Sequence, residues 1–132
     1  MIASRMTPKK ILLVDDDRDL VDLWKRFLVE AGYEVDIAYD GREGLGLALK
    51  GGYALVVLDA MMPRMDGLGV LEQMNSADPR PNNGPVVMIS NLDRDSLSAK
   101  AVKLGALGCI TKSNTNPAAF VSEVKKFLTQ VG

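Results

Sequence analysis

The sequence predicts a single α/β domain built around a parallel β-sheet. Short apolar runs typical of strands alternate five times with amphipathic runs typical of helices, which indicates successive βα units. Three of the strand candidates are continuous apolar runs, as expected for strands buried on both faces. With 132 residues, 47% of them hydrophobic and 25% charged, the chain has the size and composition of one globular domain.

Five segments are predicted to be strands, and a helix is expected after each. The strand candidates are Ile11 to Val14, Val35 to Tyr39, Ala54 to Leu58, Val86 to Ile89 and Gly108 to Thr111. In the first helix, apolar residues recur at helical spacing and predict a buried face; they are Leu20, Val21, Trp24, Phe27, Leu28 and Ala31. Asp17 is a favoured N-cap residue for this helix, and Gly32 suits a left-handed residue after its end.

The remaining helices are expected over Arg42 to Lys50, Leu68 to Asn75 and Ser96 to Leu104, and from Pro117 onward. Pro117 suits the first turn of the last helix. The apolar face of that helix consists of Phe120, Val121, Val124, Phe127, Leu128 and Val131. Asp66 and Gly67 are interpreted as turn residues, and Ser76 to Gly84 as an exposed loop rich in Pro, Asn and Gly.

Residues 1–8 are interpreted as a polar N-terminal tail and residues 9–132 as the folded domain. The tail lacks the apolar region of a signal peptide, and the longest apolar runs are far shorter than the roughly 18 residues of a membrane span. We therefore expect a cytoplasmic protein without a membrane partner. A net charge of −1 gives no general attraction to nucleic acid, so direct nucleic-acid binding is not expected either.

The chain contains one cysteine, Cys109, and no histidine. This composition excludes an intrachain disulfide, a zinc site that uses histidine and a nucleophile activated by histidine. Carboxylates, hydroxyl groups and lysines remain as the reactive groups. Cys109 itself is interpreted as a small apolar core residue rather than a redox group.

Polar side chains follow four of the predicted strands at the point where each strand ends. They are Asp15, Asp16 and Asp17 after the first strand, Asp59 after the third, Ser90 and Asn91 after the fourth, and Lys112 after the fifth. The carboxyl ends of parallel strands form one edge of the sheet, where ligands bind in α/β proteins. We therefore expect these groups to share one site.

Carboxylates placed within about 5 Å of one another repel by several kcal/mol unless a cation or proton compensates them. Oxygen ligands without histidine or cysteine favour Mg²⁺, with Mn²⁺ as the alternative ion. Asp59 stands alone after the central strand and suits a nucleophilic carboxylate, whereas Asp15 and Asp16 form the pair expected of metal ligands. Lys112 and Ser90 would supply a positive charge and a hydroxyl donor to phosphoryl oxygens. The pattern predicts a site for phosphoryl transfer.

Four segments of the chain resemble the response-regulator receiver domain of two-component signalling. They are Lys10 to Asp17 (KILLVDDD), Val56 to Gly67 (VVLDAMMPRMDG), Val87 to Asn91 (VMISN) and Gly105 to Lys112 (GALGCITK). Their order and spacing match the family from Lys9 onward. The resemblance implies a doubly wound, flavodoxin-like sheet of five parallel strands in the order 2-1-3-4-5, with helices on both faces.

The resemblance also implies functional roles. Asp59 corresponds to the phosphoryl acceptor, Asp16 to a direct Mg²⁺ ligand, Asp15 to its acidic partner, and the main-chain carbonyl of Met61 to a further ligand. Ser90 matches the switch hydroxyl and Lys112 the phosphate-contacting lysine. The phosphoryl donor is then a sensor histidine kinase or a histidine phosphotransfer protein, and the output passes through a downstream protein. Whether phosphorylation drives formation of a homodimer is left open.

The chain departs from the family pattern at three positions. Cys109 stands where many members carry an aromatic residue, Ser113 stands where a proline is common, and Asn91 replaces the small residue after the switch hydroxyl. Asn91 either crowds the phosphoryl pocket or adds a hydrogen bond to it. Met61 and Leu92 border the path of an attacking water in the family, and because both are apolar we expect slow self-dephosphorylation.

Two other functions are considered. Asp15 and Asp17 also resemble the nucleophile motif of haloacid-dehalogenase-type phosphatases, but the later acidic ligands and the cap insert of that family are absent from the sequence. A binding module that keeps the fold but works unphosphorylated is the second alternative. The expected function is a phosphorylation switch that signals through a changed surface and is not a turnover enzyme.

Overall fold

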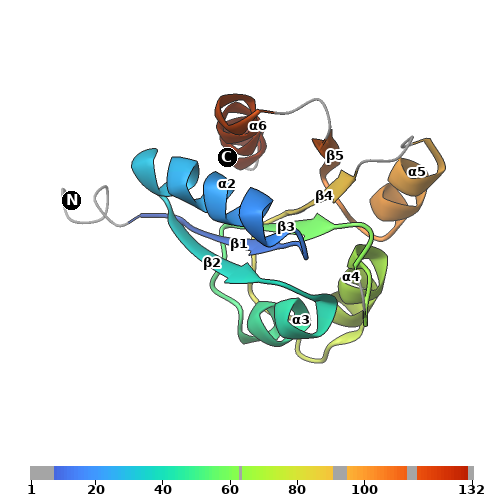
Figure 1. The fold of residues 1–132 in the computed structure, drawn as a ribbon. Coiled ribbons are helices and arrows are strands. Elements are labelled where there is room, and N and C mark those ends of the chain that lie inside the picture. The colour runs from blue at the N-terminus through green and yellow to red at the C-terminus, as the bar shows by residue number, and fades with distance from the viewer. Residues whose placement is uncertain (1–7, 63, 91–94, 113–115, 131–132) are drawn as a thin grey trace.

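The protein contains one sheet of five parallel strands in the order β2-β1-β3-β4-β5 (Figure 1). The computed structural model describes residues 8–62, 64–90, 95–112 and 116–130. The strands are β1 (Lys10–Val14), β2 (Glu34–Ala38), β3 (Leu55–Asp59), β4 (Val86–Ser90) and β5 (Gly108–Thr111). This confirms the predicted class, the strand order and all five strands. Four strands begin or end one residue away from the predicted bounds, and β3 and β4 extend by one residue to include Asp59 and Ser90.

Helices cover both faces of the sheet. They are α2 (Arg18–Glu30), α3 (Gly41–Lys50), α4 (Gly67–Ser76), α5 (Asp95–Lys103) and α6 (Pro117–Gln130). Helices α2 and α6 pack on one face, and α3, α4 and α5 pack on the other (Figure 1). Among the described residues, we find no helix that is both long enough and apolar enough to cross a membrane.

The face covered by α2 and α6 has an aromatic centre. The rings of Trp24 on α2 and Phe120 on α6 stack with centroids 3.9 Å apart and planes 11° from parallel. Both side chains are fully buried against Leu13 and Val57 of the sheet. The predicted core position of Trp24 is confirmed, whereas Phe27 is only half-buried. This packing fixes α2, and with it the loop that leaves β1.

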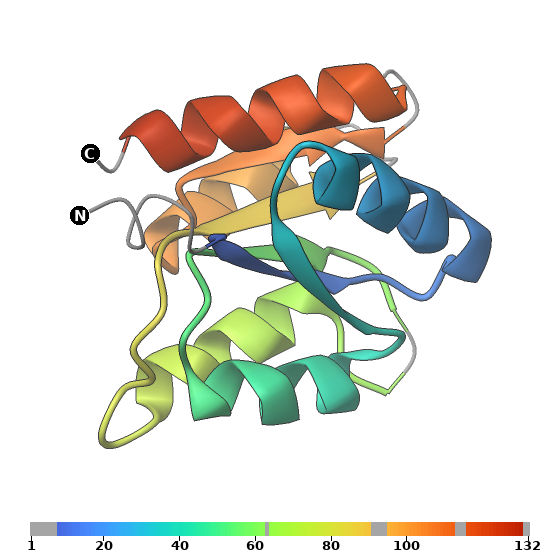
Figure 2. The ribbon, with the colours of Figure 1, turned by 90° about the vertical axis from the view of Figure 1, so that its left-hand side faces the viewer.

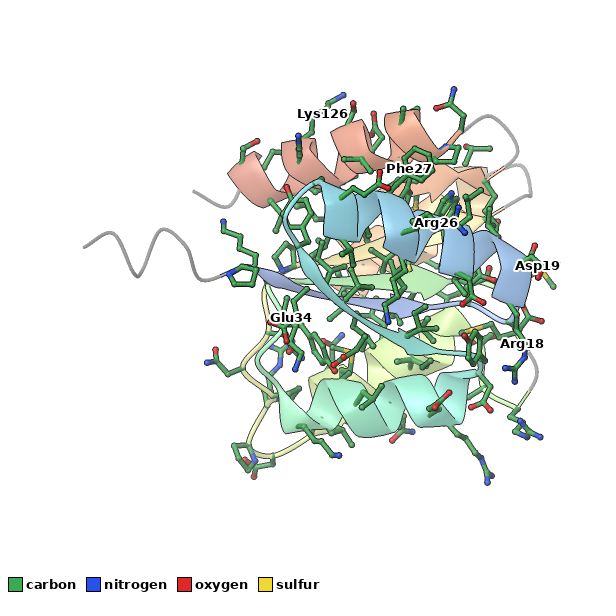
Figure 3. The ribbon with its side chains drawn as sticks, turned by 60° about the vertical axis from the view of Figure 1, so that its left-hand side comes forward. Arg18, Asp19, Arg26, Phe27, Glu34 and Lys126 are labelled. Carbon is green, nitrogen blue, oxygen red and sulfur yellow. The ribbon has the colours of Figure 1, made fainter. Side chains whose placement is uncertain are left out.

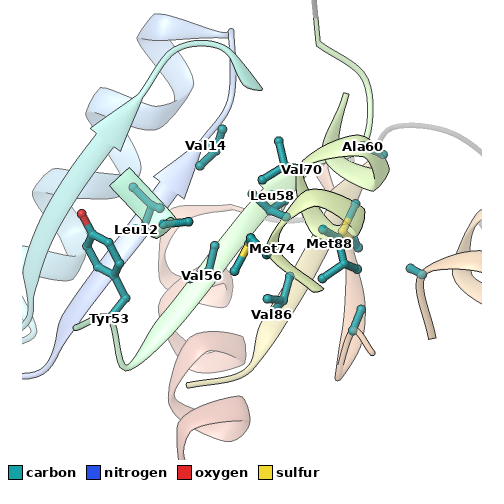
Figure 4. Packing of buried hydrophobic residues seen from close by; sticks show 14 of the residues in the cluster. Leu12, Val14, Tyr53, Val56, Leu58, Ala60, Val70, Met74, Val86 and Met88 are labelled. Carbon is teal, nitrogen blue, oxygen red and sulfur yellow. The ribbon is translucent and has the colours of Figure 1, made fainter. Parts of the chain in front are cut away.

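The opposite face is filled by aliphatic and methionine side chains from the strands, α3 and α4 (Figure 4). Leu12, Val56 and Met88 from the sheet share this cluster with Ala48 of α3 and Val70 of α4. At roughly 25 cal/mol per Å² of apolar surface removed from water, such a double-sided core supplies the main folding free energy. It makes the sheet a rigid base for side chains at the strand ends.

Helix ends follow the predicted capping chemistry. Asp17 accepts a hydrogen bond from Leu20 N at 3.2 Å, and Gly32 has a φ of 101° just past α2. Pro117 is the first residue of α6. Asp66 corrects an expectation: it is the N-cap of α4 rather than a turn residue alone, because it accepts a hydrogen bond from Gly69 N at 2.8 Å. Gly67 is correspondingly the first helical residue.

The loop predicted over Ser76 to Gly84 joins α4 to β4, with Ser76 itself closing the helix. It lies at the end of the sheet opposite the Asp59 end of β3. Figure 2 shows β2 as the open edge strand between α2 and α3. Charged residues such as Arg26, Glu34 and Lys126 lie exposed on the surface (Figure 3).

Candidate functional site

The carboxyl ends of β1, β3 and β4, with the residue after β5, bring the predicted polar groups to one edge of the sheet. Val14 pairs with Leu58 across β1 and β3, which places Asp15 beside Asp59. Asp59 in turn pairs with Ile89, the residue before Ser90. Three of the polar residues described at this edge are nearly inaccessible, with exposures of 0% for Asp15, 4% for Asp59 and 3% for Ser90.

Lys112 joins the two buried carboxylates. Its Nζ donates hydrogen bonds to Asp15 Oδ1 at 3.1 Å and to Asp59 Oδ2 at 3.3 Å, and it lies 2.9 Å from Asp15 Oδ2. The lysine side chain is itself only 9% exposed. Because buried ion pairs lose their hydration, this contact holds only if the geometry compensates for the lost water. The structure thus brings Lys112, Asp15 and Asp59 into one cluster.

Asp16 adds a third carboxylate to this cluster. One carboxylate oxygen from each of Asp15, Asp16 and Asp59 lies within 4.8 Å of the others. Asp15 and Asp59 are buried, whereas Asp16 is exposed and faces solvent. Among the described residues, the cluster therefore contains three carboxylates and one ammonium group, that of Lys112. Its solvent-exposed side is the side of Asp16.

The pKa of Asp59 is shifted upward, mainly by burial of its carboxyl group. Burial and then the charge of Asp15 raise the pKa to about 7, against the opposing effect of Lys112. Burial would lower the pKa of Lys112, but its contacts with Asp15 and Asp59 outweigh this effect and leave the pKa above its ordinary value. Lys112 is therefore charged at neutral pH, while Asp59 is poised between its two protonation states.

The donor set fits a divalent cation. Asp15 Oδ2 is buried and accepts no hydrogen bond within the part of the chain that the structure describes, although Lys112 Nζ is close. A buried carboxylate oxygen without a hydrogen bond is costly, and an oxygen-coordinated ion would satisfy it. Oxygen ligands alone, with one side open to solvent, suit Mg²⁺ and its retained waters.

The loop after β3 begins at the site. Met61 N donates a hydrogen bond to Asp59 Oδ1 at 3.3 Å, and Ala60 N donates to Ile89 O at 2.8 Å. These bonds fix the chain that leads to the Met61 carbonyl. Met61 is 62% exposed, and its contact with Asp59 is made by its main-chain N–H.

Sequence reasoning missed the role of Gly67 in shaping this loop. A Cβ at Gly67 would overlap the main-chain oxygen of Asp59 and would lie 2.7 Å from Met88 Cε. The first turn of α4 therefore packs directly on the back of Asp59. The Asp66–Gly67 dipeptide was a sequence signal for this close approach, but it fits an ordinary turn equally well.

Not every predicted site residue lies in the cluster. Cys109 pairs with Met88, two positions before the end of β5, and its half-buried side chain packs with the core on the α4 side of the sheet. Asp17 caps α2, and its N–H donates to Asp15 Oδ1 at 2.9 Å. Asn91, Leu92 and Ser113 lie outside the described residues, so the predictions made for them stay predictions.

Residues 11–125 match the family model described as "response regulator receiver domain". A similar curated protein is the transcriptional regulatory protein HprR of Escherichia coli (strain K12), with 46% identity over 103 residues. The response regulator MprA of Mycolicibacterium vanbaalenii is 41% identical over 99 residues. These matches cover 78% and 75% of the chain but only 44% and 41% of the relatives. The chain spans less than half the length of these curated relatives.

Solved structures of similar fold cover nearly the whole chain. A CheY-like receiver domain protein from Methanospirillum hungatei JF-1 has a TM-score of 0.82 and 30% identity, over 94% of this chain and 96% of that one. The receiver domain of the Francisella response regulator 1452 has a TM-score of 0.81 and 27% identity, over 94% and 99% of the two chains.

Proposed function

Since the chain belongs to the family of response-regulator receiver domains, we propose that it is a phosphorylation switch in which Asp59 accepts the phosphoryl group. The observation that carries this proposal is the position of Asp59, buried at the end of β3 between Asp15 and Lys112. The donor is a phosphohistidine on a sensor histidine kinase or on a histidine phosphotransfer protein.

In the transfer step, a carboxylate oxygen of Asp59 attacks the phosphorus atom, and the bond between phosphorus and the imidazole nitrogen breaks. The electron pair of that bond leaves with the imidazole, and an aspartyl phosphate forms. Catalysis of such a step depends mainly on positioning and on compensation of charge. The hydrogen bond from Met61 N to Asp59 Oδ1 orients the carboxylate so that its other oxygen is available.

Lys112 and Ser90 act on the phosphoryl oxygens. Lys112 Nζ already lies 3.3 Å from Asp59 Oδ2, so a small shift allows it to pair with a phosphoryl group attached there. Ser90 lies at the end of the neighbouring strand, where its hydroxyl can donate to another phosphoryl oxygen. Drawing Ser90 inward would couple phosphorylation to the chain that leads into α5.

Asp15, Asp16, Asp59 and the main-chain carbonyl of Met61 would hold the Mg²⁺ or Mn²⁺ ion. When bound, the ion supplies positive charge that offsets the carboxylates and the phosphoryl oxygens. The grouping of three carboxylate oxygens within 4.8 Å of one another supports this assignment. The pKa of Asp59, which burial and then the charge of Asp15 raise to about 7, agrees with a site where a cation would favour the ionised carboxylate.

The signal is read on the surface of α5 and β5. Val102 on α5 and Leu107 before β5 are exposed apolar residues there, at 58% and 40% exposure. A downstream protein binds this surface, or a second copy does so in a phosphorylation-dependent homodimer. Cys109 on β5 stands where many relatives carry an aromatic residue, so the signal cannot pass through rotation of an aromatic side chain at this position. Its transmission from Asp59 depends instead on Ser90 and the chain after β4.

Self-dephosphorylation should be slow. The Met61 side chain is apolar and largely exposed, so it offers no group that orients an attacking water. We expect the aspartyl phosphate of the purified protein to persist for minutes or longer. Its loss within seconds, followed by phosphate release, would contradict this expectation.

The test is incubation of the purified chain with Mg²⁺ and a small acyl phosphate, followed by intact-mass measurement. We expect one added phosphoryl group, no addition after chelation of Mg²⁺, and none in Asp59→Asn. Equal labelling of Asp59→Asn would move the acceptor elsewhere. If the wild type binds neither Mg²⁺ nor the phosphoryl group, the unphosphorylated binding module is favoured, and repeated turnover of a phosphate monoester would instead indicate a phosphatase.

A further inference from the structure

An ion pair joins the loop between β3 and α4 to the loop between β2 and α3, which lies outside the carboxylate cluster. Arg64 Nη1 donates to Asp40 Oδ2 at 2.8 Å across 24 positions of sequence. Asp40 also caps α3, because its Oδ1 accepts a hydrogen bond from Glu43 N at 2.8 Å. One carboxylate thus holds both the start of α3 and the loop that follows Asp59.

Gly41 provides the closer contact between the two loops. It is buried, and a Cβ at this position would overlap the carbonyl oxygen of Met65 and lie 2.8 Å from Met65 Cβ. The main chain of Met65 therefore rests directly on the main chain of Gly41. Only a residue without a side chain permits this approach.

The backbone conformation of Arg64 is consistent with a loop whose shape is maintained by contacts with other segments of the chain. Arg64 has a φ of 70°, in the left-handed region that residues other than glycine rarely adopt. Such a conformation persists where its surroundings hold it. The surroundings here are the Asp40 ion pair on one side and the Met65–Gly41 contact on the other.

We propose that Asp40 and Gly41 are positioning residues for the site, because they hold the β3–α4 loop in the shape that presents the Met61 carbonyl beside Asp59. The inference rests on the proposed function, in which that carbonyl is a Mg²⁺ ligand. At its other end the loop is anchored by Gly67 N, which donates to Ala60 O at 3.2 Å. Between Ala60 and Gly67, Arg64 contacts Asp40 and Met65 contacts Gly41, and we infer that these two contacts set the position of the loop.

The test compares Mg²⁺ affinities, measured by titrating the metal alone into the labelled protein and following amide chemical shifts. Gly41→Ala should weaken Mg²⁺ binding by about 10- to 100-fold, as expected when a group that supports a metal ligand is displaced. Gly46→Ala is the benign control, since a Cβ on this exposed residue of α3 meets nothing within 4 Å.

Gly84→Ala is the control for lost stability alone. A Cβ there would overlap the carbonyl oxygen of Ala54 at the opposite end of the sheet. It creates the same kind of main-chain clash as Gly41→Ala but far from the carboxylates. For Gly84→Ala we expect a lower melting temperature and an unchanged Mg²⁺ affinity. If the role of Gly41 were merely structural, Gly41→Ala would give the same two results.

Asp40→Asn and Arg64→Gln test the ion pair without a clash. Asn still caps α3 through its oxygen, so Asp40→Asn removes the charge and the acceptor of Arg64 Nη1 but keeps the cap. Because the pair is partly exposed, each change should weaken Mg²⁺ binding by about two- to fivefold, and the double variant by no more than either single one. These variants decide the matter if Gly41→Ala does not fold.

Unchanged Mg²⁺ affinity in folded Gly41→Ala, or in both charge variants when Gly41→Ala does not fold, would overturn the positioning role. The proposed Mg²⁺ site would then still stand. If the wild type itself binds no Mg²⁺, the proposed function fails first, and the positioning role fails with it.

Discussion

Polar side chains form contacts at both the amino ends and the carboxyl ends of the strands, but the amide and charged side chains at the amino ends are half-buried or exposed, whereas Asp15 and Asp59 at the carboxyl ends are buried. At the amino ends, the Asn83 side chain accepts from Tyr53 N at 3.1 Å and donates to Ala48 O at 2.9 Å. Tyr53 Oη donates to Asp36 Oδ2 at 2.7 Å, and Lys10 Nζ lies 3.4 Å from the same oxygen. The polar groups of this end have partners within the protein.

At the carboxyl ends, two buried carboxylates share one lysine, and an oxygen of Asp15 has no hydrogen bond among the described residues. Burial and the charge of Asp15 raise the pKa of Asp59 to about 7. The polar groups of the amino ends are thus paired within the protein, whereas the carboxylates of the carboxyl ends outnumber the lysine that pairs with them among the described residues.

The largest effect is expected from Lys112→Ala. Removing the ammonium group leaves Asp15 and Asp59 buried without a cation, so the free energy of unfolding should fall by roughly 3 kcal/mol in the absence of Mg²⁺. Added Mg²⁺ should recover part of the loss. Urea unfolding with and without the metal measures both.

The matched control is Lys126→Ala. Lys126 is exposed and lies 3.4 Å from Glu123 Oε2, so its removal should change stability by about 0.5 kcal/mol or less. If Lys112→Ala loses no more than Lys126→Ala, the buried ion pairs do not stabilise the site as described.

Asp59→Asn should stabilise the metal-free protein in a pH-dependent way. A carboxyl with a higher pKa in the folded state favours folding fully below the unfolded pKa of about 3.9 and loses this advantage as the pH rises through about 7. The variant should therefore match the wild type near pH 4 and exceed it near pH 8, by on the order of 2 kcal/mol. Thermal or urea unfolding across this range gives the difference.

The same difference should shrink when Mg²⁺ is added, because the ion compensates the ionised carboxylate of the wild type. A stability difference that does not vary with pH would mean that Asp59 ionises at its ordinary pKa and that the site carries no excess negative charge.

At the opposite end, Asn83→Ala should lower the free energy of unfolding by roughly 1–2 kcal/mol, because Tyr53 N and Ala48 O lose their partner. Mg²⁺ affinity should not change. Asn82→Ala, at an exposed neighbour, is the control and should have little effect. A clear loss of Mg²⁺ affinity in Asn83→Ala would show that the two ends are not independent.

The smallest effect is expected from Tyr53→Phe. The ring stays buried, but Asp36 loses the 2.7 Å hydrogen bond, so stability should fall by about 0.5–1.5 kcal/mol. Tyr39→Phe removes a more exposed hydrogen bond to Asp22 and should have a smaller effect. Equal losses from the two variants, measured by urea unfolding, would mean that the hydrogen bond of the buried Tyr53 contributes no more than the exposed one of Tyr39.

Much of the fold was predictable because its signals are local. Apolar runs identified every strand, and helical spacing identified the buried faces of α2 and α6. The strand ends were less predictable, because Asp59 and Ser90 continue the hydrogen-bonded ladder although their side chains are polar. A prediction from the apolar pattern of the sequence alone ends each strand at its last apolar residue and so leaves out these polar residues.

The site was predictable to the extent that its residues follow strands. Asp15, Asp59, Ser90 and Lys112 share one edge because parallel strands end together, which the sequence order already implies. The bridging position of Lys112 and the contact between Gly41 and Met65 join segments that are distant in sequence. No local pattern encodes such contacts, so they required the structure.

Chemical mapping of the phosphorylated residue decides whether Asp59 carries the phosphoryl group. The protein is treated with an acyl phosphate and Mg²⁺, the aspartyl phosphate is reduced with borohydride to homoserine, and tandem mass spectrometry locates the changed position. We predict homoserine at position 59 alone. Homoserine at position 15 or 16, or a stable phosphoryl group on Ser90, would contradict the account.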